Sequence, residues 1–60
     1  MNYIVKAELA NGKIETSSYN TEAEAINAFC SESDRIGSEL SAVFLTEIKS
    51  GAEVEILSAY

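Results

Sequence analysis

The side chains that could carry chemistry in this 60-residue chain are ten acidic residues, one cysteine and three tyrosines. Histidine, the commonest general base and metal ligand, does not occur in the sequence. Close carboxylate pairs such as Glu53 and Glu55 are unavoidable when ten acidic residues fall within sixty positions. Neither the oxygen-ligand spacing of a calcium loop nor a glycine-rich phosphate loop is present. We therefore expect no catalytic residue, no metal site and no cofactor.

The single cysteine, Cys30, has no neighbour that would favour its thiolate. Helical spacing places it near Ile26, Phe29 and Asp34, and none of these is basic. We expect a small core or boundary residue, and a protein without enzymatic activity. One unpaired cysteine and the lack of a signal-peptide core favour the cytoplasm.

The charge balance is ten acidic against four basic residues, a net charge of −6. The cations Lys6, Lys13, Arg35 and Lys49 form no basic stripe, so we expect no direct binding to nucleic acid and none to anionic membranes. An acidic surface can attract a basic protein, imitate a nucleic-acid backbone, or simply keep a small protein in solution.

Asn11-Gly12 predicts a β-hairpin, because a two-residue type I′ turn needs positive φ at both central positions. Strands at about residues 2–10 and 13–19 then pair with Val5 opposite Ser18. This register places one set of side chains on a common face: Tyr3, Val5, Ala7, Leu9 and Ile14. The other face carries Ile4, Lys6, Glu8, Lys13, Glu15 and Tyr19.

A helix is predicted over residues 22–36. Thr21 followed by Glu24 is the capping-box spacing, and Gly37 is a plausible stop. The apolar residues of one stripe recur at helical spacing: Ala25, Ile26, Phe29 and Ile36.

Two further strands, 42–48 and 53–58, flank Ser50-Gly51. A three-residue loop, Lys49-Ser50-Gly51, with Gly51 in the left-handed conformation would pair Phe44 with Ile56 and Thr46 with Val54.

The simplest packing is a single α+β domain, residues 1–60, with β-β-α-β-β order. One helix lies across a four-stranded antiparallel sheet of order 2-1-3-4. The expected core comprises Tyr3, Val5, Leu9, Ile14, Ile26, Phe29, Ile36, Phe44, Ile48, Val54 and Ile56. The uncovered face would present Ile4, Val43, Leu45 and Leu57, with Tyr19 extending it and charged residues around it: Lys6, Glu8, Glu15, Glu47, Glu53 and Glu55.

An apolar centre with a charged border is typical of a protein-binding surface. We predict a small acidic, non-enzymatic interaction module of inhibitor or adaptor type that contacts another protein through Ile4, Tyr19, Val43, Leu45 and Leu57. The alternatives are a homodimer that buries this face against a second copy, and an acidic nucleic-acid mimic. Scattered exposed aliphatic residues, or a register error, would also account for the pattern.

The edges of the sheet offer a different mode of contact. Strands two and four could pair with a partner's strand through backbone hydrogen bonds, although their serines and glutamates work against it. Size and acidity alone make the chain similar to many small phage and mobile-element proteins.

Overall fold

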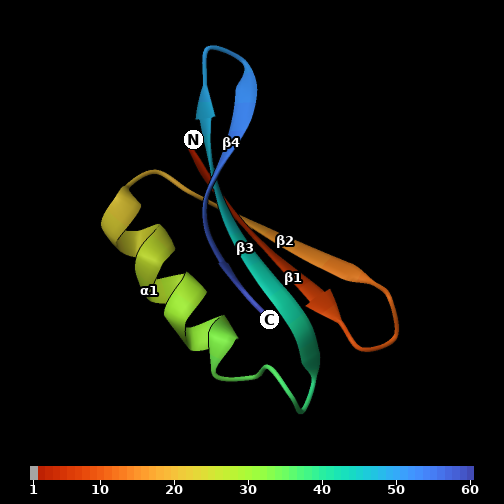
Figure 1. Ribbon diagram of the computed structural model, residues 1–60. Helices are drawn as coiled ribbons and strands as arrows, with labels where there is room; N and C mark the ends of the chain where they lie inside the picture. The colour runs from red at the N-terminus through yellow and green to blue at the C-terminus, as the bar shows by residue number, and fades with distance from the viewer. Residues whose placement is uncertain (1) are drawn as a thin grey trace.

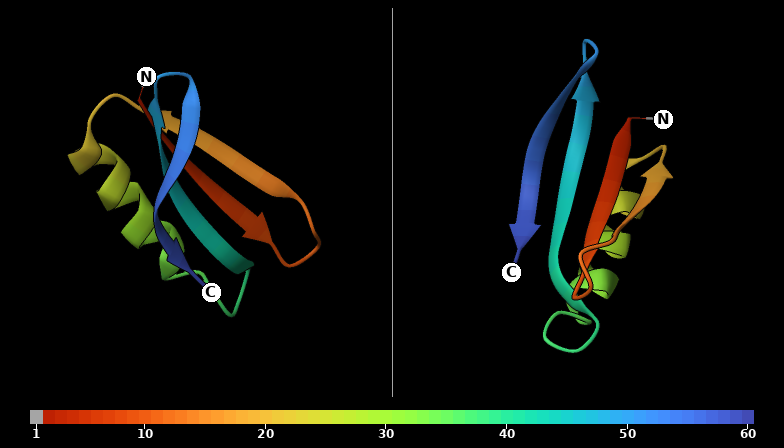
Figure 2. Two further views of the ribbon diagram at one scale, coloured as in Figure 1. Left: turned by 45° about the horizontal axis from the view of Figure 1, so that its top comes forward. Right: turned by 90° about the vertical axis from the view of Figure 1, so that its right-hand side faces the viewer.

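The computed structural model describes residues 2–60, which form four strands and one helix (Figure 1). The elements are β1 (Tyr3–Leu9), β2 (Ile14–Tyr19), α1 (Glu22–Ser33), β3 (Leu40–Lys49) and β4 (Ala52–Ala59). The strands make one antiparallel sheet in the order β2-β1-β3-β4, as predicted. The helix packs on β3, β1 and β2, and β4 stands clear of it on the far side of β3 (Figure 2, right). One side of the sheet is therefore the helix side, and the opposite side is called the outer face below.

The β1–β2 hairpin closes through the three-residue loop Ala10–Gly12, and the predicted two-residue loop is wrong. Leu9 N–H donates to the Lys13 carbonyl at 2.7 Å, and Gly12 N–H donates to the Leu9 carbonyl at 2.9 Å. Gly12 alone in this loop has positive φ, 92°, as expected of a type I turn followed by one left-handed residue. The Asn11 side chain accepts a hydrogen bond from Lys13 N–H at 3.0 Å, which supports this turn.

The extra loop residue moves β2 by one position relative to the predicted register. Val5 lies opposite Ser17, not Ser18, and Tyr3 lies opposite Tyr19. Because side chains alternate between faces, a one-residue shift exchanges the two faces of the whole strand. Tyr19 consequently lies on the helix side, and Ile14, paired with Glu8, lies on the outer face.

The β3–β4 hairpin has the two-residue loop that was expected in the first hairpin. Ser50 and Gly51 both have positive φ, 52° and 80°, and Lys49 pairs with Ala52. This is a type I′ turn. The left-handed Gly51 is confirmed, but the three-residue loop is wrong.

A β-bulge in β4 changes the pairing again. Thr46 lies opposite Glu55 and Leu45 opposite Leu57, so Ile56 is an extra residue with no partner of its own. The predicted pairs of Phe44 with Ile56 and Thr46 with Val54 are therefore wrong.

The central strand β3 has the opposite orientation to the one expected. Apolar residues lie on both of its faces, so alternation alone does not identify the buried one. The pairing with β1 decides it: Val5 lies opposite Leu45, and Ala7 opposite Val43, all on the helix side. Val43 and Leu45 are fully buried (0% exposed), and the predicted position of these two residues on the uncovered face is wrong.

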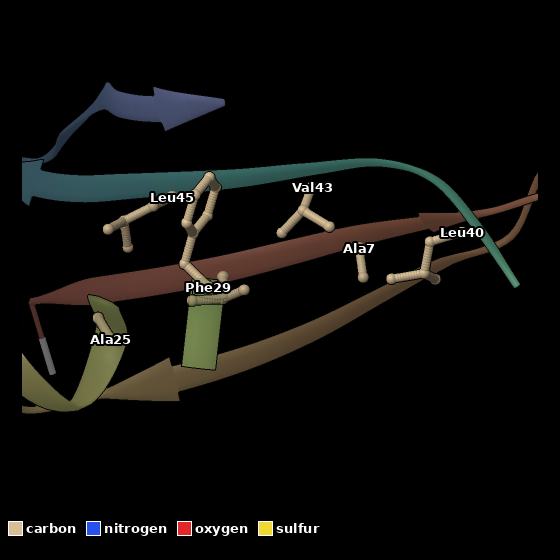
Figure 3. Packing of buried hydrophobic residues seen from close by; sticks show 7 residues of the cluster. Ala7, Ala25, Phe29, Leu40, Val43 and Leu45 are labelled. Atoms are coloured by element: carbon tan, nitrogen blue, oxygen red, sulfur yellow. The ribbon is translucent and has the colours of Figure 1, made fainter. Parts of the chain in front are cut away.

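The core is a thin layer between α1 and the sheet (Figure 3). Its buried members are Val5, Ala7, Ala25, Phe29, Leu40, Val43 and Leu45. Ala25 is fully buried, so the helix approaches the strands closely, and Phe29 supplies the one large ring in the layer. Tyr3, Leu9, Ile26 and Ile36 pack around this layer as predicted. The other predicted core residues lie outside it: Ile14, Phe44, Ile48, Val54 and Ile56. The one-residue shift of β2 places Ile14 on the outer face, and the orientation of β3 places Phe44 and Ile48 there. Val54 and Ile56 belong to β4, which the helix does not cover.

The predicted capping box starts the helix. Glu24 N–H donates to Thr21 Oγ1 at 3.3 Å, and the Thr21 hydroxyl donates to Glu24 Oε1 at 3.0 Å. The helix ends at Ser33, three residues before the predicted end at Ile36. The Ser33 hydroxyl donates to the Phe29 carbonyl at 2.7 Å, and the amides of Arg35 and Ile36 bond three residues back, which tightens the turn. Gly37, with φ 96°, then redirects the chain toward Leu40.

Two paired leucines provide a test of this core. Leu45 is fully buried, whereas its neighbour across the β3–β4 ladder, Leu57, is 39% exposed. We expect Leu45→Ala to lower the free energy of unfolding by about 2–5 kcal/mol, and Leu57→Ala to lower it by less than about 1 kcal/mol. Urea unfolding followed by circular dichroism measures both. A Leu45→Ala chain that is already unfolded in buffer agrees with the expectation, whereas equal losses for the two variants would contradict it.

Candidate functional site

The residues predicted to form one interaction surface lie on different parts of the molecule. Val43 and Leu45 are in the core, and Tyr19 is half-buried against it from the helix side. Leu57 is exposed, but it lies opposite Leu45 and therefore on the helix side of β4. Of the predicted set, Ile4 lies on the outer face, where it is half-buried.

The outer face nevertheless carries an apolar centre, made of different residues. Lys6 pairs with Phe44 and Ile4 with Thr46, so Phe44 and Ile48 of β3 share the face of Ile4. The Phe44 ring meets the Tyr60 ring edge to face, with centroids 5.8 Å apart and planes at 80°. Tyr60 is 81% exposed. Ile4, Phe44, Ile48 and Tyr60 are called the outer patch below.

Thr46 lies on the outer face between Phe44 and Ile48, and its hydroxyl group is hydrogen-bonded. It is buried, and its hydroxyl donates to the Ile4 carbonyl at 3.4 Å. Thr46 therefore adds no unsatisfied polar group to the outer face between Phe44 and Ile48.

Charged residues border the outer patch on two sides. Lys6 Nζ and Glu53 Oε1 form an ion pair at 2.7 Å, which joins β1 to β4 across the outer face. Glu8 accepts a hydrogen bond from the Ser41 hydroxyl at 3.0 Å. Glu55, opposite Thr46, lies beside Glu53 along β4. The three carboxylates Glu8, Glu53 and Glu55 are called the acidic border, and Lys6 is the cation among them.

Sequence reasoning missed two aromatic residues of the outer patch. Phe44 was expected in the core through its predicted pairing with Ile56, and Tyr60 is the last residue of the sequence. One signal did indicate the correct side. Phe44 alternates with Thr46, and a threonine in the middle of a strand is a poorer core residue than the leucine beside it.

Tyr3, on the helix side of the sheet, has a pKa shifted from its ordinary value. It lies opposite Glu47 in the β1–β3 ladder. Partial burial raises the pKa of Tyr3 above its usual 10.0. The negative charges of Glu47 and Glu22 raise it further, because they disfavour the ionised form of the Tyr3 phenol.

Arg35 holds the turn that follows α1. Its guanidinium pairs with Glu32 at 2.7 Å and with Glu39, to which Nε donates at 2.8 Å. These ion pairs are largely exposed, and such pairs contribute little to stability. Their role is to order the segment between α1 and β3.

Residues 2–60 contain no cluster of three or more side chains able to hold a metal ion, and no pocket forms among them. Cys30 is exposed on α1, so its predicted place in the core or at its boundary is wrong. None of the helical residues described forms a segment long and apolar enough to cross a membrane. The features left for function are surfaces rather than cavities.

Comparisons with protein-family models, with curated protein sequences and with solved structures return no match for this chain.

The raised pKa of Tyr3 predicts a loss of stability in alkali. The folded protein holds the phenol proton of Tyr3 more tightly than the unfolded chain does. The stability that this difference contributes is therefore fully present below about pH 10 and is lost as the pH rises through the folded-state pKa. We expect Tyr3→Phe to lose less stability than the wild type between pH 8 and pH 11, as measured by urea unfolding. Tyr60→Phe, which leaves Tyr3 and Glu47 in place, serves as the control and should keep the wild-type loss. Identical alkaline losses in all three proteins would exclude this role of Tyr3.

Proposed function

We propose that this protein is a small acidic, non-enzymatic interaction module, of inhibitor or adaptor type, that binds another protein through the outer face of its sheet. The observation that supports the proposal is the aromatic pair of the outer patch, in which the half-buried Phe44 packs against the exposed Tyr60. Tyrosine and other aromatic residues dominate the energetics of protein interfaces, because they bury a large area at a small cost in side-chain entropy. An exposed, unpaired Cys30 is compatible with a reducing compartment, and we propose the cytoplasm as the location.

The size of an ordinary interface brings the acidic border into the contact. A standard complex buries about 800 Å² on each partner, roughly a fifth of the 3795 Å² that this chain exposes. Such an area extends beyond the four residues of the outer patch and includes Glu8, Glu53 and Glu55. The partner that fits best therefore has an apolar centre surrounded by lysine or arginine.

A second copy of this chain fits the outer face less well. Two outer faces pressed together would bring two acidic borders into one contact, and each chain carries a net charge of −6. We therefore expect a monomer of about 6.5 kDa in light scattering at micromolar concentration and moderate salt. A dimer that dissociates on Phe44→Ser would instead assign the outer patch to self-association.

Substitutions within the outer patch test the proposed surface. The partner is first captured from cell lysate. We expect Phe44→Ser to weaken its binding by about 2 kcal/mol, roughly 30-fold, and Tyr60→Ala to weaken it as well. Ser17→Ala is the control, because Ser17 is exposed on the helix side of β2 and belongs to no proposed contact surface. Affinities are measured by titration calorimetry on variants whose far-ultraviolet circular dichroism matches the wild type. Unchanged affinity in both outer-patch variants would refute the proposal.

A further inference from the structure

The edge of β4 is a second surface, separate from the outer patch. This strand pairs with β3 on one side and has no neighbouring strand on the other among residues 2–60. Every residue from Ala52 to Ser58 is exposed. Alternate residues of an antiparallel strand turn their backbone groups to opposite sides, so about half of the N–H and C=O groups of β4 face this open edge.

The helix leaves the helix side of β4 uncovered. It packs on β3, β1 and β2, and β4 projects past β3 away from it (Figure 2, right). Val54 and Leu57 on that side are 44% and 39% exposed. Both pair with β3 residues, Val54 with Glu47 and Leu57 with Leu45, so they form an apolar shelf that continues the buried layer outward.

The other side of β4 is acidic over the same stretch. Glu53 and Glu55 lie opposite Ile48 and Thr46, on the outer face. An extended segment that paired with the open edge would therefore meet apolar side chains on one of its faces and carboxylates on the other. Cross-strand neighbours of this kind are the main source of side-chain specificity between adjacent strands.

We propose that the open edge of β4 receives an extended segment of a partner protein in which basic and apolar residues alternate. The segment adds a fifth strand to the sheet by backbone hydrogen bonds. Its apolar side chains cover Val54 and Leu57, and its lysine or arginine side chains lie beside Glu53 and Glu55. The regular ladder from Ala52 to Glu55 sets the register, since the bulge at Ile56 twists the strand beyond it.

Two other arrangements fit these observations less well. Pairing of β4 with β4 of a second copy would place the Glu53 and Glu55 carboxylates of both chains side by side, which is unfavourable. The opposite edge, β2, is polar over most of its length, with Thr16, Ser17 and Ser18 exposed, and it offers no comparable apolar shelf. The inference does not rest on the outer patch, because it depends on the backbone edge of β4 and on Val54 and Leu57; it shares with the outer face the carboxylates Glu53 and Glu55.

Amide hydrogen exchange on the full 60-residue chain tests the proposal. The probe is an end-capped eight-residue peptide of alternating lysine and valine. The peptide is added at about ten times its Kd. We then expect the β4 amides that face the open edge to exchange about tenfold more slowly than in the free protein, because they exchange only when the peptide has dissociated. The β2 amides should be unaffected. A peptide with a central proline cannot continue the ladder and serves as the control.

Charge variants complete the experiment. Glu55→Gln should weaken peptide binding by about two- to fivefold, the range of an exposed ion pair, and Glu15→Gln on β2 should leave it unchanged. The proposal is overturned if the β4 amides are not slowed, if the proline peptide slows them equally, or if the peptide acts on β2. Shifts confined to Phe44, Ile48 and Tyr60 would place the peptide on the outer patch and would also overturn it.

Discussion

A single helix must cover a four-stranded sheet, and this shortage of covering surface determines the rest of the structure. The contact between α1 and the sheet runs through Ala25 and Phe29, which meet Leu45, Val43 and the inner side of β1. A helix of twelve residues that packs this closely reaches three strands, so most of β4 stays exposed and the outer face has no covering layer. In so small a domain, the burial of Leu45 and Val43 makes a large contribution to stability.

Contacts with neighbouring side chains partly shield the apolar residues of the outer face from solvent. On the outer face, the Phe44 ring packs against Tyr60, and the Thr46 hydroxyl is satisfied by the Ile4 carbonyl. The ion pair of Lys6 with Glu53 spans the sheet over the same area. These contacts reduce the apolar area that the outer face exposes, while Tyr60 remains 81% exposed. On β4, Val54 and Leu57 have no such cover.

Loop length decided which residues of β2 reach each face. The loop at Asn11 has three residues, one more than expected, and a shift of one residue exchanges the faces of a strand. Tyr19 therefore packs on the core, and Ile14 faces outward. Asn-Gly is compatible with either loop, and the bond from Lys13 N–H to the Asn11 side chain favours the longer one.

The sequence by itself determined the element order, the strand order 2-1-3-4, the helix start at Thr21 and the presence of more apolar residues than one helix can cover. The elements follow from local signals, namely the capping box, turn residues and alternation, which depend on a few neighbouring positions. The strand order follows from joining the two hairpins so that every neighbouring pair of strands is antiparallel. The tertiary structure alone decided which face of β3 is buried, because both faces carry apolar side chains: Val43 and Leu45 on one, Phe44 and Ile48 on the other. That competition is settled by the register with β1 and by the narrow space beneath α1, where two aliphatic side chains fit beside Phe29.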